Sequence, residues 1–206
     1  MKACLVNYNY TPDWLQDYDL DYVIYDRSDS DEYLKYFPPE RIIKTKNIGN
    51  VDYDKLGYII DHYHDLPEVF LWGKTNLFKY ITKEEFDAVK DNVTFTPLLT
   101  QNHKTYSDEF GPVCYYSGGL YHERNNSWYR NTMAYRIPSF QDFASYLHIP
   151  APGFIPFAPG GNYILTREVV HKYGVDFYKK MRALLPYTQL PAEAHYCERS
   201  YFCIWA

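Results

Sequence analysis

Residues 55–73 read KLGYIIDHYHDLPEVFLWG, and this stretch gives the first indication of the fold. Apolar side chains recur at helical spacing between residues 51 and 64, and the helix is expected to end before Pro67 because the position before a proline disfavours helical geometry. The short apolar run 68–72 follows at once and is typical of a buried strand. Gly73 is expected to end that strand, so that Lys74, and no carboxylate, follows it.

The rest of the chain alternates between strand-like and helix-like segments. Residues 101–135 and the proline- and glycine-rich segment 150–161 show neither period and are expected to be irregular, with 117–126 as a loop that can cover a ligand. The sequence predicts a single α/β domain over residues 1–206. The further strands are expected at 2–9, 21–26, 41–45, 92–98 and 162–166, and the further helices at 82–90, 139–149, 166–174, 175–186 and 192–205.

Composition and charge exclude several classes of protein. The chain has 206 residues, 46% of them hydrophobic, and a formal net charge of -5. No basic face is visible, which argues against a nucleic-acid partner. The apolar runs are shorter than a membrane span, and the first residues lack the extended apolar core of a signal peptide. We therefore expect a soluble cytoplasmic protein whose four cysteines are reduced thiols.

Short polar and glycine-containing segments are candidates for ligand binding. The segment NIGN at 47–50 precedes a helix, whose first N–H groups can hold a phosphate, but it is equally compatible with a simple turn. In APGGN at 158–162, Gly160 and Gly161 allow a ligand to approach the backbone. The pattern DSD at 29–31 offers two carboxylates to a divalent cation, although it also fits an ordinary exposed turn.

Several of these segments together resemble a glycosyltransferase-like family that has long been catalogued only as a domain of unknown function. The likeness touches most of the chain, in the order that the family shows. The segments that carry it are VNYNYTPDWL (6–15), YDRS (25–28), NIG at 47–49 with KLGYIIDHYHDLPEVFLWG (55–73), PFAPGGNYILTREVV (156–170), FYKKMRALL (177–185) and AEAHYCERSYFCIW (192–205).

The resemblance implies a GT-A-like fold, with a central mixed and mainly parallel sheet flanked by helices. It also implies a glycosyltransferase that moves a sugar from a nucleoside diphosphate, expected to be a uridine diphosphate sugar, to a hydroxyl of a glycan or glycoprotein. Glu198 is the first candidate for the catalytic carboxylate, followed by Glu123 and Asp142. The expected donor-binding residues are Asn7, Tyr8, Asp26, Arg27, Gly49, Asn50, Lys74, Gly160 and Gly161.

The chain departs from the family pattern after the strand 68–72. GT-A enzymes carry an acidic pair there that holds Mn²⁺ or Mg²⁺, whereas this chain reads WGKTN. A divalent cation therefore stays an open alternative, with no ligands assigned. Lys74 can instead supply positive charge to the departing diphosphate. The absence of this acidic pair also favours an alternative hypothesis, in which the chain is a sugar- or nucleotide-binding module of the same fold without catalysis.

Overall fold

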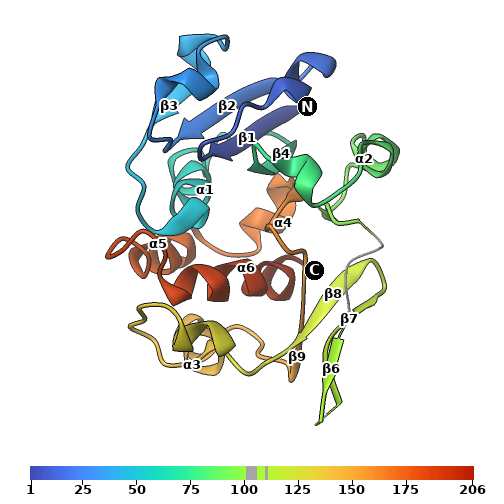
Figure 1. Cartoon of the computed structure of the whole chain (residues 1–206), viewed down its shortest axis with the longest axis vertical. Helices are drawn as coiled ribbons and strands as arrows, with labels where there is room; N and C mark the ends of the chain where they lie inside the picture. Colours follow the sequence, from blue (N-terminus) through green and yellow to red (C-terminus); the bar gives the residue numbers. More distant parts are fainter. Residues whose placement is uncertain (101–105, 110) are drawn as a thin grey trace.

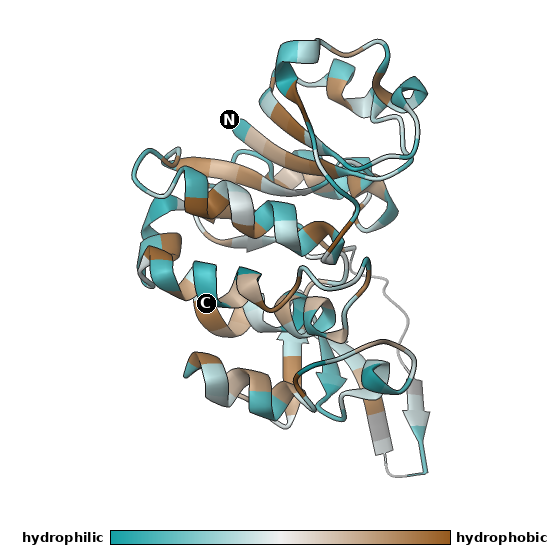
Figure 2. Ribbon diagram, turned by 90° about the vertical axis from the view of Figure 1, so that its left-hand side faces the viewer, coloured by the Kyte–Doolittle hydropathy of each residue, from teal (hydrophilic) through white to brown (hydrophobic). Residues whose placement is uncertain are grey.

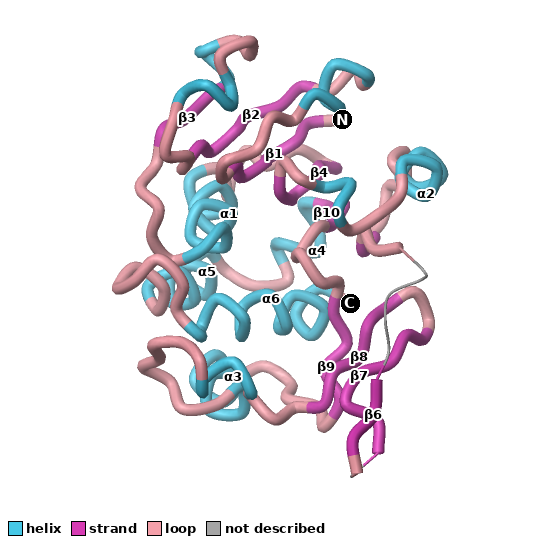
Figure 3. The backbone as a smooth tube through the Cα atoms, in the orientation of Figure 1, coloured by secondary structure: helices cyan, strands magenta, loops and turns pink. Residues whose placement is uncertain are grey.

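The computed structural model describes residues 1–100, 106–109 and 111–206. These residues form a six-stranded sheet and a four-stranded sheet. Helices lie between the two sheets, as the smooth trace in Figure 3 shows. The chain is thus an α/β protein with a mixed sheet flanked by helices, and this part of the sequence-based prediction is confirmed.

The six-stranded sheet has the order β3-β2-β1-β4-β10-β5 (Figure 1). Strands β3, β2, β1 and β4 are parallel, and β10 runs antiparallel to both β4 and β5. The sheet is therefore mixed, and every strand that the sequence predicted is present in it. The bounds are β1 Lys2–Asn7, β2 Asp21–Asp26, β3 Ile42–Lys44, β4 Val69–Lys74, β5 Thr96–Pro97 and β10 Tyr163–Thr166.

The predicted helices are also confirmed. Hydroxyl side chains cap three of them: Thr82 forms a capping box with Glu85, and Ser139 and Thr166 each accept a first-turn N–H. The α-helices are α1 Asn50–Asp61, α2 Lys83–Val89, α3 Phe140–Leu147, α4 Arg167–His171, α5 Val175–Ala183 and α6 Ala192–Trp205. Short 3₁₀ helices cover Asp13–Asp17, Asp31–Leu34, Pro39–Arg41, Leu77–Lys79 and Trp128–Asn131.

The large sheet is buried on both faces. Along β1, Cys4 and Val6 join the core that packs against α1, α5 and α6, whereas Ala3 and Leu5 join a second core with Trp14 of the 3₁₀ helix Asp13–Asp17. This alternation follows from the two-residue period of a strand. Because both sides are covered, the strands are apolar along their length, and Figure 2 shows them in brown beside the N-terminus.

The four-stranded sheet contradicts the expectation that residues 101–135 and 150–161 are irregular. It has the order β6-β7-β8-β9, with antiparallel pairs. Gly118 and Gly119, with φ of 59° and 79°, form the two-residue turn of a hairpin, so the predicted loop 117–126 is largely β8. The bounds are β6 Tyr106–Asp108, β7 Gly111–Ser117, β8 Leu120–Arg124 and β9 Phe154–Phe157. For residues 101–105 and 110, that expectation lies outside the described residues.

Strand β9 forms although it contains Pro156, because it is an edge strand and an edge tolerates the missing N–H. Strand β4 likewise continues through Gly73, which was predicted to end it. A Cβ at Gly73 would lie 2.7 Å from the Oδ1 atom of Asn162, so this glycine permits close approach of a neighbouring side chain. The four cysteines are free. None of the described helices is long and apolar enough to cross a membrane.

Candidate functional site

The strand order reverses at β1. Strands β2 and β3 lie on one side of β1, and β4 lies on the other. In open α/β sheets, ligands bind at such a reversal, outside the carboxyl ends of the strands. Asn7 at the end of β1 pairs in register with Asp26 of β2, and its neighbour Val6 pairs with Lys74 of β4. Three predicted site residues thus share one edge of the sheet.

Asn7 connects the ends of these three strands. Its side chain is fully buried and donates hydrogen bonds of 3.1 Å to Asp26 and 3.0 Å to Ser28. Its Oδ1 atom accepts a hydrogen bond of 2.5 Å from Thr75, which follows β4. Asn7 therefore fixes the relative position of the loops that leave β2 and β4.

Asp26 is also held in place. Its carboxylate accepts hydrogen bonds of 2.6 Å from the Ser28 hydroxyl and 2.5 Å from the Lys44 ammonium group. Burial opposes ionisation of this carboxyl, but the hydrogen bonds from Lys44, Ser28 and Asn7 outweigh it and lower its pKa. Asp26 is therefore a buried anion that orders the start of the loop after β2.

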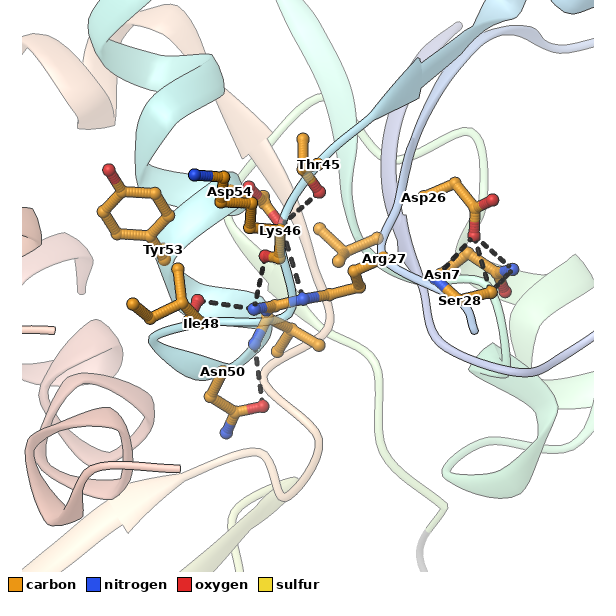
Figure 4. A network of polar contacts seen from close by, with 12 residues as sticks. Asn7, Asp26, Arg27, Ser28, Thr45, Lys46, Ile48, Asn50, Tyr53 and Asp54 are labelled. Atoms are coloured by element: carbon orange, nitrogen blue, oxygen red, sulfur yellow. Dashed lines mark hydrogen bonds and ion pairs between the residues drawn. The ribbon is translucent and has the colours of Figure 1, made fainter. Parts of the chain in front are cut away.

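Arg27 follows Asp26 and is 3% exposed (Figure 4). Its Nη2 atom donates hydrogen bonds of 3.3 Å to the carbonyl of Lys46 and 2.5 Å to that of Ile48. Its Nε atom lies 3.6 Å from a carboxylate oxygen of Asp54. Among the described residues, its buried Nη1 atom has no hydrogen-bond partner. Arg27 thus keeps one donor available beside the amino end of α1.

A cavity of about 270 Å³ lies next to this guanidinium group. The turn before α1 shapes it: Gly49 and Asn50 have φ of 71° and 56°, and their N–H groups donate to the carbonyls of Thr188 and Gln189. The cavity therefore brings together three predicted donor-binding residues, Tyr8, Arg27 and Asn50. Its lining residues are Tyr8, Arg27, Asn47, Asn50, Val51, Gln189 and Leu190. A larger cavity of about 590 Å³, at the amino end of β4, is lined by none of the predicted site residues.

The segment Gly160–Asn162 joins the sheet edge to two helices. Gly160 has a φ of 90°, and a Cβ there would lie 2.7 Å from the ring of Tyr80, so only glycine fits. Each residue of the segment is hydrogen-bonded to a different helix or strand. Gly160 N–H donates to Glu198 of α6 at 2.8 Å, Gly161 C=O accepts from Lys55 of α1, and Asn162 Oδ1 accepts from Lys74 N–H of β4 at 2.8 Å.

Glu198 and Lys74 influence each other across this segment. Burial opposes ionisation of Glu198, but the charges of Lys74, Arg199 and His195 outweigh it and lower the pKa of the carboxyl. Burial likewise opposes protonation of Lys74, and the charge of Glu198 raises its pKa. Both groups are therefore charged at neutral pH. The side chain of Glu198 is 17% exposed.

Lys55 belongs to the same site, next to Asp52, but was not predicted from the sequence. Lys55 is fully buried, with its Nζ atom 3.7 Å from the ring centroid of Trp72. Burial lowers its pKa to about 8, against the opposing charge of Asp52. Asp52 accepts a hydrogen bond of 2.6 Å from the hydroxyl of Tyr201. A lysine in the second turn of a helix looks solvent-exposed in sequence, and no local signal marks it as buried.

The other two candidate carboxylates are engaged elsewhere. Glu123 on β8 forms an ion pair with Arg199 and accepts a hydrogen bond of 2.9 Å from Trp128, so it reaches the site only through Arg199. The carboxylate of Asp142 accepts a hydrogen bond of 2.5 Å from the Ser139 hydroxyl at the start of α3. No hydrogen bond or ion pair among the described residues joins it to Glu198. Of the three, Glu198 alone faces Lys74.

His195 is a second residue of the site that the sequence did not reveal. It lies one turn before Glu198 on α6, and its ring stacks on Tyr129 with centroids 5.1 Å apart. Its buried Nε2 atom has no hydrogen-bond partner among the described residues. Burial and the charge of Arg199 lower its pKa, so its imidazole is neutral at pH 7.

The DSD pattern at 29–31 does not form a cation site. Asp29 accepts a hydrogen bond of 2.8 Å from Asn9, and Asp31 pairs with Lys44. Within residues 1–100, 106–109 and 111–206, no three His, Cys, Asp or Glu side chains gather as they would to hold a metal ion. The turn interpretation of this pattern is therefore the better one.

The chain matches no family model, and comparisons with curated proteins and with solved structures find no match either. The fold and the site thus define the class by themselves. This is an α/β protein with a mixed sheet, and charged and amide side chains gather where its strand order reverses.

Proposed function

We propose that this protein is a GT-A-like glycosyltransferase that uses a nucleoside diphosphate sugar, with a uridine diphosphate sugar as the expected donor. The observation that supports it most is the convergence of the ends of β1, β2 and β4, the start of α1 and the segment Gly160–Asn162 at one edge of the sheet. Such an edge is where nucleotides bind in open α/β sheets.

The cavity beside Arg27 suits the nucleoside end of the donor. Tyr8 is 48% exposed and offers an aromatic face on which a base can stack. Asn50 offers an amide group, and the unpartnered Nη1 atom of Arg27 offers a donor to a carbonyl or phosphate oxygen. The diphosphate then extends along the sheet edge toward Lys74 and Glu198.

Glu198 is the proposed base. In an inverting transfer, the acceptor oxygen bonds to the anomeric carbon, the bond from that carbon to the diphosphate oxygen breaks, and the diphosphate leaves with the electron pair. The proton of the acceptor hydroxyl passes to the carboxylate of Glu198. Its lowered pKa keeps Glu198 ionised and ready to accept that proton at neutral pH, although it also makes the carboxylate a weak base.

A thermal-shift panel of UDP, GDP and ADP, with and without MnCl₂, tests the proposal. A ligand at about 100 times its Kd adds about 2.7 kcal/mol of stability and raises Tm. We expect UDP to give the largest shift. If no nucleoside diphosphate shifts Tm in either condition, the protein is not a nucleotide-sugar transferase.

A second candidate function is a nucleotide- or sugar-binding module without catalysis, and the lysine in place of an acidic pair favours it. Hydrolysis of UDP-glucose by the wild type and by Glu198→Gln separates the two. A transferase hydrolyses the donor slowly, and Glu198→Gln should reduce that rate by at least about 100-fold, within the range for a lost acid–base group. Equal rates would remove Glu198 from the mechanism, and no hydrolysis would support the binding module.

A further inference from the structure

Lys74 lies where the family resemblance implies an acidic pair that holds a cation. It is the last residue of β4, and the strand order reverses between β4 and β1. Its backbone N–H donates to the Oδ1 atom of Asn162, and a Cβ at Gly73 would clash with that same atom. The side chain of Lys74 therefore leaves the strand from a fixed point.

The ammonium group of Lys74 is available to a ligand. Its Nζ atom lies 5.3 Å from the ring centroid of Tyr80, which also packs against Gly160. No direct ion pair with a carboxylate holds it among the described residues, although Glu198 and Asp52 are near enough to influence it. Lys74 is thus a partly exposed cation that is held near carboxylates without being neutralised by direct contact.

Side chains supply positive charge around the end of β4. Lys74 and Lys55 carry ammonium groups beside the carboxyl groups of Glu198 and Asp52. Arg199 lies 3.4 Å from a carboxylate oxygen of Glu198. Here the positive charge belongs to side chains that α1 and β4 hold in place, because Gly161 accepts a hydrogen bond from Lys55 and Asn162 accepts one from the backbone of Lys74.

The residues near the end of β4 do not fit a divalent cation. Hard cations require several oxygen ligands. The nearest carboxyl groups are those of Asp52 and Glu198, which each already accept a hydrogen bond, from Tyr201 and from Gly160. The ammonium group of Lys74 lies near both of them and would repel a divalent cation. No group of three or more metal-ligating side chains exists within the described residues. The cation that the family resemblance implies therefore has no ligand set at this place.

We propose that Lys74 replaces the divalent cation and binds the diphosphate of the donor, so that this protein binds nucleoside diphosphates without a metal ion. This inference rests on the proposed function. The ammonium group donates hydrogen bonds to phosphate oxygens and stabilises the charge that develops when the diphosphate leaves.

Isothermal titration of the full chain with UDP and with uridine tests this inference. In EDTA and in excess MnCl₂, we expect the Kd of UDP to differ by less than about threefold, well under 1 kcal/mol. Lys74→Met should raise the Kd of UDP by about 10- to 100-fold, as for a lost hydrogen bond to a charged group, and leave that of uridine unchanged. Lys74→Arg should restore most of the affinity for UDP.

Lys79→Met is the matched control. Lys79 is exposed and also follows β4 in the chain, and the substitution removes the same positive charge as Lys74→Met. This control should leave both affinities unchanged. The inference is overturned if UDP binds only with MnCl₂, a result that needs no variant. It is also overturned if Lys74→Met leaves UDP binding intact or weakens UDP and uridine equally. Failure of the wild type to bind either compound would instead overturn the proposed function itself.

Discussion

The ammonium group of Lys55 donates a hydrogen bond to the carbonyl oxygen of Gly161, although the two residues are 106 positions apart in the chain. This contact fastens the glycine segment to α1 from inside the protein, because Lys55 is fully buried. A buried lysine has a lowered pKa, and here the value falls from 10.5 to about 8.

The lowered pKa of Lys55 predicts a pH-dependent difference in stability between the wild type and Lys55→Met. Between pH 8 and pH 10.5, the unfolded wild type binds about one more proton at this group than the folded protein does. The free energy of unfolding of the wild type should therefore rise with pH relative to the variant, by on the order of 3 kcal/mol over this range. Urea denaturation at both ends of the range measures the difference. A difference that shrinks as pH rises would contradict the prediction.

Gly160→Ala should destabilise the protein beyond the cost of a positive φ. An added Cβ would lie 2.7 Å from the ring of Tyr80 and would displace the N–H that binds Glu198. Gly118→Ala is the control, since Gly118 also has a positive φ but has no atom within 4 Å of an added Cβ. We expect Gly160→Ala to cost about 1–3 kcal/mol more than the control. Chemical denaturation of both variants tests this, and equal losses would mean that the Tyr80 contact relaxes freely.

The ion pair between Glu123 and Arg199 should show strong coupling, because the two residues are 8% and 4% exposed. Removal of either partner leaves the other charge buried and only partly compensated. In a double-mutant cycle with Glu123→Leu and Arg199→Met, we expect a coupling free energy of about 2 kcal/mol or more. The exposed pair of Asp17 and Lys83 is the comparison, with an expected coupling below about 1 kcal/mol. Similar couplings for both pairs would show that burial adds nothing here.

Asn7→Ala should be more costly than an ordinary loss of an asparagine. The substitution removes three side-chain hydrogen bonds, including those to Asp26 and Thr75, from a fully buried position. We expect a loss of about 2–4 kcal/mol in the free energy of unfolding. Asn92→Ala removes one hydrogen bond, to Thr96, from a partly buried position and should cost about 1 kcal/mol. Equal losses from the two variants would refute the linking role of Asn7.

The sequence by itself determined the elements of the large sheet and of the helices around it. Local patterns carry that information: apolar positions recur at helical spacing along α1, and Thr82 and Ser139 accept the first free N–H groups of α2 and α3. These signals depend on residues that are close together in the chain, so they can be recognised without knowledge of the fold. Lys74 was singled out by its place after the predicted strand 68–72, whereas Glu198 was singled out by the family resemblance.

Only the tertiary structure decided which side chains meet. The small sheet escaped prediction because Pro156 lies within β9 and the glycine turn at 118–119 separates β7 from β8, and pairing with neighbours makes these segments strands. Lys55 becomes a buried cation only because Gly161 and Trp72 surround it. Arg199 meets Glu123 from a position 76 residues away. Burial makes an unpaired charge costly, so the folded protein pairs its buried charges through contacts between distant residues. No local pattern in the chain predicts which residues make these contacts.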